Sequence, residues 1–172
     1  MASKIKVDQL ETADGTGTIA LQNQLSGLTS ASMPTGSVIQ VVQNYIASET
    51  SSTSTSYVAT AGTITVTPQF SNSKILISVQ SFFWNKTASA GGVLTIYRGS
   101  TDLAVGSQMA RIYPVDGGKI QHHVNIAYLD SPNTTSATTY TVYMKNSYGT
   151  SEMKFGSSSA EGITMMAQEI KG

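Results

Sequence analysis

Apolar and polar residues alternate in short runs along most of the chain, and Gly, Asn, Asp and Ser separate the runs. Thr63–Thr67 alternates strictly, and Thr139–Asn146 repeats the pattern with Tyr140, Val142 and Met144 on one side. A period of two indicates half-buried strands, and about eight of them at spacings of roughly ten residues predict an all-β antiparallel sandwich or jelly roll. The expected strands are Ser37–Gln43, Thr63–Thr67, Lys74–Trp84, Val93–Arg98, Leu103–Ile112, Ile120–Leu129, Thr139–Asn146 and Ile163–Ile170, with Met153–Phe155 as a short candidate. The polar tract Ala47–Ser56 is expected to be a loop.

Two of these strands are apolar on both faces, namely Ser37–Gln43 and Lys74–Trp84. One face of an antiparallel sheet normally meets solvent and is polar. A second apolar face therefore indicates contact between subunits, and Val38, Val41 and Phe82 are the residues we expect at that contact. Burial under a loop or under the N-terminal segment is the alternative.

The first residues form a separate pattern. Lys4–Leu10 and Thr18–Leu21 are predicted to be two short strands joined by a turn at Asp14–Gly17. An isolated hairpin is marginally stable in water, so its apolar side chains are expected to dock onto another surface. We therefore divide the chain into an arm, residues 1–32, and a β-domain, residues 33–172; Leu21–Leu28 is the one helix candidate. The expected docking residues of the arm are Ile5, Val7, Leu10, Ile19 and Leu21.

Charge and composition narrow the classes of function. Net charge is zero, and 12% of the residues are charged, against about 25% in an average soluble protein. Nucleic-acid binding and polybasic membrane contact both need clustered Lys and Arg, which the sequence lacks. Cysteine is absent, so disulfides and thiolate chemistry are excluded, and no apolar run approaches the ~18 residues that predict membrane insertion.

The histidines, aspartates and glutamates, residue types that are often catalytic or metal-binding in other proteins, have structural explanations in this sequence. His122 and His123 are adjacent on a predicted strand and point to opposite faces, so they do not converge on one ion. The aspartates, such as Asp130, fall in predicted turns, and the glutamates are scattered. We expect no catalytic, cofactor-binding or metal-binding residue. Among the aromatic residues, Tyr148 in a predicted loop is the candidate for contact with a receptor glycan, and Trp84 is expected in the core.

Several segments resemble the virion structural proteins of tailed bacteriophages. They are Lys4–Asp8 with Asp14–Gly17, Met33–Val42, Thr65–Pro68 with Ser71–Ile77, and Ile163–Ile170. The resemblance implies an N-terminal attachment or trimerisation motif, followed by a trimeric jelly roll of the complement and tumour-necrosis-factor type. It implies a non-enzymatic homotrimer, assembled in the host cytoplasm into the virion, with other virion proteins and host-surface glycan as partners.

Three functions are compatible with this pattern. The first is a tail fibre or tail appendage that docks through its arm and contacts the host surface. The second is a capsid decoration or head-fibre protein, which would be present in hundreds of copies per particle. The third is a free carbohydrate-binding lectin module.

Overall fold

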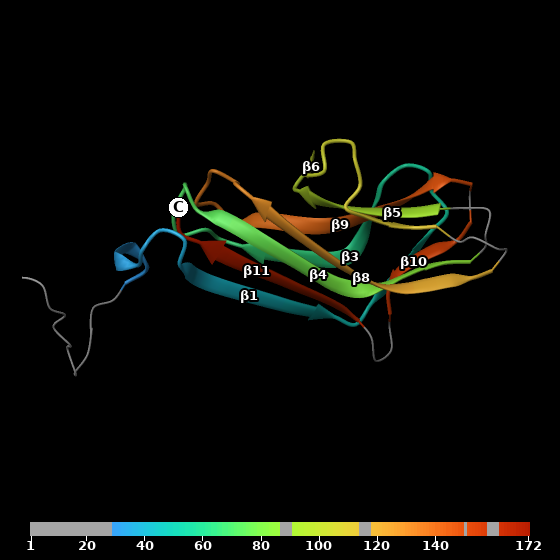
Figure 1. The fold of residues 1–172 in the computed structure, drawn as a ribbon, viewed down its shortest axis with the longest axis horizontal. Coiled ribbons are helices and arrows are strands. Elements are labelled where there is room, and N and C mark those ends of the chain that lie inside the picture. The colour runs from blue at the N-terminus through green and yellow to red at the C-terminus, as the bar shows by residue number, and fades with distance from the viewer. Residues whose placement is uncertain (1–28, 87–90, 114–117, 150, 158–161) are drawn as a thin grey trace, which may run out of the picture. The chain divides into compact units, whose positions relative to one another are not determined.

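The computed structural model describes residues 29–86, 91–113, 118–149, 151–157 and 162–172. The chain comprises two units, Met1–Ser32 and Met33–Gly172. In the first unit, the described residues form one short 3-10 helix, η1 (Ser30–Ser32), in which the Ser32 amide donates to the carbonyl of Thr29 at 2.9 Å. The second unit is an antiparallel β-sandwich of two sheets (Figure 1).

The first sheet, sheet A, is centred on β4. This strand pairs with β8 on one side and with β11 and β10 on the other, and β1 and β2 complete the sheet. The strands are β1 (Val38–Ile46), β2 (Glu49–Ser52), β4 (Lys74–Asn85), β8 (Ile120–Asp130), β10 (Met153–Gly156) and β11 (Ile163–Ile170).

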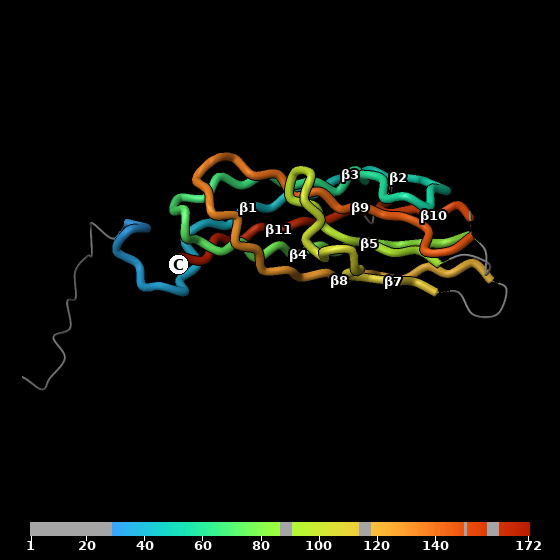
Figure 2. The backbone as a smooth tube through the Cα atoms, turned by 90° about the horizontal axis from the view of Figure 1, so that it is seen from above, coloured from blue at the N-terminus to red at the C-terminus, as the bar shows by residue number. Residues whose placement is uncertain are grey.

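The second sheet, sheet B, has the order β3, β9, β5 and β6, with β7 also paired to β5. Its strands are β3 (Val58–Val66), β5 (Gly91–Arg98), β6 (Thr101–Asp102), β7 (Ala110–Ile112) and β9 (Thr138–Tyr148). The edges of the two sheets meet where β7 lies beside β8 and where β1 lies beside β3 (Figure 2).

Several short strands share one position in their sheet. β10 and β11 pair with different parts of the same side of β4. β2 pairs with β10, and β1 pairs with β11. β6 and β7 both pair with the side of β5 that faces away from β9. If β1 with β2, β6 with β7 and β10 with β11 are each counted as one position, the sandwich has eight strand positions. Numbered along the chain, they run 1-8-3-6 in sheet A and 2-7-4-5 in sheet B.

The core lies between the two sheets, as the alternating pattern predicts. Ile75, Ile77, Val79 and Phe83 of β4 are fully buried against Tyr140 and other residues of the opposite sheet. The first and last residues of the unit lie together, because the Gly36 amide donates to Lys171 and the Lys171 amide donates to Ser37. Both ends of the sandwich chain are therefore at the same end of the fold (Figure 1).

A buried carboxylate, Glu169 of β11, closes this end of the core. Its side chain accepts hydrogen bonds from the backbone amides of Gln69 at 2.7 Å and Phe70 at 3.3 Å. These bonds from the connection between β3 and β4 give the buried carboxylate the hydrogen-bond partners that it needs away from water. Glu169 therefore has a structural role.

The structure corrects two expected elements. Ala47–Ser56 was expected to be a loop, yet it contains β2, which pairs with β10. Leu103–Ile112 was expected to be one strand, but only β7 at its end is extended. The Asp102 carboxylate accepts hydrogen bonds from the amides of Ala104 at 3.0 Å and Gly106 at 3.2 Å, and this side-chain capping favours a turn over a strand.

Candidate functional site

The outer face of sheet A, which points away from the core, is the most unusual surface of the sandwich. The cross-strand registers place Val38, Val41 and Phe82 on this one face, although they lie far apart in the sequence. Val41 is 55% exposed and Val38 is 49% exposed. We call the following set the uncharged face: Val38, Val41, Gln43, Tyr45, Leu76, Ser78, Gln80, Phe82, His123, Asn125, Ala127, Leu129, Thr164, Met166, Gln168 and Ile170.

Charge is distributed unevenly over the strands that form this face. Asp130 and Glu169, the carboxylates of β8 and β11, both point inward and are buried. Lys74 stands at one margin, and Glu49, Lys119 and Lys154 stand at the opposite end. The area between these margins offers amides, hydroxyls and apolar groups to solvent, a composition that resembles the centre of a protein interface.

The outer face of sheet B has a different chemistry. Threonines on β3 and β9 lie opposite each other, and the hydroxyls of Thr65 and Thr139 are 2.8 Å apart. Next to them the rings of Tyr97 and Tyr143 stack with centroids 4.1 Å apart. Small hydroxyl side chains suit a solvated surface, whereas the uncharged face of sheet A carries exposed apolar side chains such as Val41.

A groove surrounds Trp84 at the end of sheet A away from Lys74 and Ile170. Its volume is about 210 Å³, and the residues that line it are Glu49, Phe82, Trp84, Lys119, Gln121, Lys154, Gly156 and Ser157. The ammonium groups of Lys119 and Lys154 lie 4.8 and 5.1 Å from the Trp84 ring centroid. Trp84 was expected in the core, but it points to the outer face and is half-buried.

Tyr148, expected in a loop, is the last residue of β9. Its ring packs against Tyr113, with centroids 5.3 Å apart, and the Arg111 guanidinium lies 5.2 Å from the Tyr113 ring. Desolvation and a hydrogen bond with Tyr113 raise the pKa of the Tyr148 hydroxyl above its ordinary value. Tyr148 is thus engaged within the fold, while Tyr113 is the more exposed partner.

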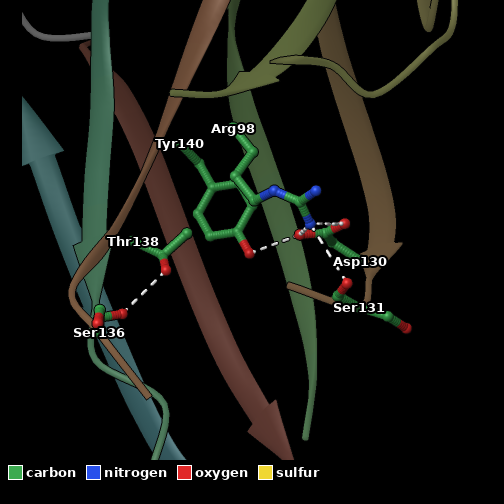
Figure 3. Close-up of polar contacts among 6 residues, drawn as sticks. All are labelled: Arg98, Asp130, Ser131, Ser136, Thr138 and Tyr140. Carbon is green, nitrogen blue, oxygen red and sulfur yellow. Dashed lines mark hydrogen bonds and ion pairs between the residues drawn. The ribbon is translucent and has the colours of Figure 1, made fainter. Parts of the chain in front are cut away.

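A polar network of Arg98, Asp130 and Tyr140 links the two sheets (Figure 3). The Arg98 guanidinium of β5 donates to both carboxylate oxygens of Asp130 at 2.8 Å, and the Tyr140 hydroxyl donates to Asp130 at 2.8 Å. Arg98 also donates to the carbonyl of Ser131 at 3.3 Å. Asp130 therefore has both carboxylate oxygens satisfied, and the arrangement stabilises the sandwich without leaving a reactive group.

Tyr140 gives the protein a predicted sensitivity to alkaline pH. Burial, and next the hydrogen bond to Asp130, raise the pKa of its hydroxyl far above the ordinary value of 10.0. The folded state then retains a proton that the unfolded state loses, so stability is complete below about pH 10 and falls as the pH rises above it. Urea unfolding at about pH 9 and about pH 11 is expected to show a steeper loss for wild type than for Tyr140→Phe, by up to ~1.4 kcal/mol per pH unit. Equal losses would contradict the assignment.

Within the described residues, no group of three or more His, Asp or Glu side chains is placed to hold a metal ion. His122 and His123 are both exposed in the single subunit. The His123 ring lies on the outer face of sheet A, against Phe82 with centroids 3.8 Å apart. No described helix is long and apolar enough to cross a membrane.

Two kinds of residue were not predicted from the sequence as parts of a site. The network of Arg98, Asp130 and Tyr140 and the groove partners Lys119 and Lys154 depend on strands that are distant in sequence, so no local pattern signals them. The predicted docking residues of the arm lie outside the described residues: Ile5, Val7, Leu10, Ile19 and Leu21.

No protein-family model matches the chain, and no curated protein matches it in sequence. The geometry itself defines the class: an all-β domain in which two antiparallel sheets pack as a sandwich.

Proposed function

We propose that this chain is a homotrimeric virion structural protein of tailed bacteriophages, a tail fibre or tail appendage whose N-terminal arm docks to the particle. The observation that carries the proposal is the uncharged face of sheet A, which combines exposed apolar side chains with an absence of charge on the four strands that form it, β1, β4, β8 and β11, apart from Lys74 at the margin. Exposed hydrophobic side chains gathered on one face mark protein–protein interaction sites.

The composition of the face favours a second copy of the chain as its occupant. Amide side chains both donate and accept hydrogen bonds, so Gln43, Gln80 and Asn125 can pair with identical groups. A like-charged face would repel its own copy, and this face has no charge to do so. Leu129 and Val41 add apolar area toward the end that holds the termini. Closed assemblies of identical subunits bury surfaces that can pair with surfaces of another copy.

The strand order supports a jelly roll as the finer description of the sandwich. The order 1-8-3-6 in one sheet and 2-7-4-5 in the other is that of an eight-strand jelly roll, the double-sheet arrangement made from two Greek keys. Jelly rolls of the complement and tumour-necrosis-factor type are trimers, and the sequence resemblance to phage virion proteins points to the same class.

The resemblance also supports the role of the arm. The arm is joined to the sandwich at Met33, whose carbonyl accepts a hydrogen bond from the Lys171 ammonium, and the sandwich would contact the host. A capsid decoration or head-fibre protein would use the same arrangement. Copy number distinguishes the two: a few to a few tens per particle for a tail part, and hundreds for decoration.

The oligomeric state is the direct test of this proposal. Light scattering after size exclusion is expected to give a trimer for the full chain and for a form that begins near Met33, since the interface belongs to the sandwich. A trimer only with the arm present would make the arm the trimerisation device. Monomers in both cases would overturn the proposal.

Replacement of both Val7 and Ile19 by Asp tests the docking role of the arm. We expect this variant to be lost from assembled particles because charged side chains disfavour an apolar docking surface, while circular dichroism of the sandwich stays unchanged. Quantitative immunoblots of purified virions provide the measurement, with Thr16→Asp in the predicted turn as control. Normal incorporation of the double variant would refute docking through these residues.

A further inference from the structure

We propose that the groove around Trp84 binds an acidic saccharide, a sugar chain that carries carboxylate groups. This inference rests on the proposed function for its biological setting, since it assigns a ligand class to the host contact. Its physical basis is independent of that setting and consists of the shape, charge and position of the groove.

The groove combines an aromatic surface with polar groups of several kinds. Trp84 of β4 provides the aromatic surface, Phe82 forms the border with the uncharged face, and Gln121 of β8 provides an amide that both donates and accepts. Sugar rings present a C–H face and a rim of hydroxyls, so they are bound where aromatic rings lie beside amides and carboxylates. The volume of about 210 Å³ accommodates a sugar ring better than a folded protein element, and small-ligand sites are concave in this way.

Charge makes the groove selective for an anion. The Lys154 ammonium pairs with Glu49 at 2.8 Å, and none of the ion pairs among the described residues involves Lys119. Two ammonium groups and one carboxylate give the lining a net positive charge, although the protein as a whole is neutral. The negative face of the indole holds both ammonium groups close to the groove, where a ligand carboxylate can reach them.

The position of the groove keeps it accessible in the proposed trimer. Charged residues are depleted at the centres of protein interfaces, and Glu49, Lys119 and Lys154 lie beyond the uncharged face at the end of the sheet away from Lys74. A trimer joined through the uncharged face would therefore leave its three grooves open to solvent.

The test compares two trisaccharides of the same length, trigalacturonate and its neutral galactose counterpart, by titration calorimetry with the full-length protein. We expect binding of the acidic sugar and binding at least tenfold weaker for the neutral one. Lys119→Gln is expected to remove most of this preference, and Trp84→Ala to weaken binding of the acidic sugar at least tenfold. Lys145→Gln, whose ammonium lies 4.4 Å from the Tyr57 ring on sheet B, is the matched control for Lys119→Gln and should bind as wild type does.

Competition experiments identify other occupants. Displacement of the sugar by an equal concentration of inorganic phosphate would show a small-anion site and overturn the proposal. So would binding of a poly-glutamate peptide without binding of trigalacturonate, which would point to an acidic segment of another protein. Equal affinity for both sugars, or full affinity in Lys119→Gln, would also overturn it. Because light scattering on the same samples reports the trimer, loss of the assembly and loss of the saccharide site are distinguished.

Discussion

Val41→Glu is expected to convert the proposed trimer to monomers while each sandwich stays folded. Val41 is 55% exposed in the single subunit, so the new carboxylate costs the isolated domain little. In the assembly, the same carboxylate would be removed from water without a partner, which costs about 3 kcal/mol or more for each subunit contact. Since 1.4 kcal/mol is a factor of about ten, association is expected to weaken more than a hundredfold at each contact. Light scattering across a concentration series measures this change.

Thr63→Glu is the matched control for this variant. Thr63 is exposed on β3, an edge strand of sheet B, as Val41 is exposed on β1, an edge strand of sheet A. Its hydroxyl makes only a long contact of 3.4 Å with Thr141. Thr63→Glu should remain a trimer. If both variants dissociate, general surface charge controls assembly; if Val41→Glu remains a trimer, the uncharged face is not the interface.

Asp130→Ala is expected to destabilise the sandwich by about 3 kcal/mol, because removal of one partner of a largely buried pair leaves the other without compensation. The Arg98 side chain is 29% exposed and that of Asp130 is 8% exposed, so Arg98 retains partial access to water and the loss stays below that of a fully buried pair. Tyr140 would also lose the acceptor of its hydroxyl. Urea unfolding followed by circular dichroism measures the change.

A double variant separates the contribution of the Arg98–Asp130 ion pair to stability from that of side-chain packing. Arg98→Met with Asp130→Leu replaces the ion pair by apolar groups and is expected to recover much of the stability, since buried pairs are often no better than apolar substitutes. Tyr140→Phe, which removes one hydroxyl, should cost about 1 kcal/mol. An Asp130→Ala variant as stable as wild type would mean that the network contributes no stability.

The alternation of residues was sufficient to predict the faces of the longest strands. Lys74–Trp84 was divided into a core side and an outer side, and the structure has Ile75 and Phe83 buried and Leu76 on the outer face. Thr139–Asn146 was divided correctly in the same way. These predictions succeed because successive side chains of a strand point to opposite faces, a local property of the backbone.

The errors occur where distant contacts decide the conformation. Glu49–Ser52 is polar and was expected to be a loop, yet β10 provides a partner along its whole length. Asp130 was expected in a turn, but it ends β8 inside the fold because Arg98 and Tyr140 satisfy its carboxylate. A single sequence gives no sign of such partners, since they come from strands that precede or follow by many residues.

The sequence by itself determined the all-β class, the low charge, the absence of thiol chemistry and the inward or outward direction of most strand residues, because these depend on composition and on the two-residue period. Only the tertiary structure decided which outward residues share a surface. Pairing of β1 with β11 and of β4 with β8 and β11 gathers Val38, Val41 and Phe82 onto one uncharged face, and pairing of β10 with β4 brings Lys154 to Trp84. Hydrogen-bonded register between distant segments produces these surfaces, and no local pattern encodes that register.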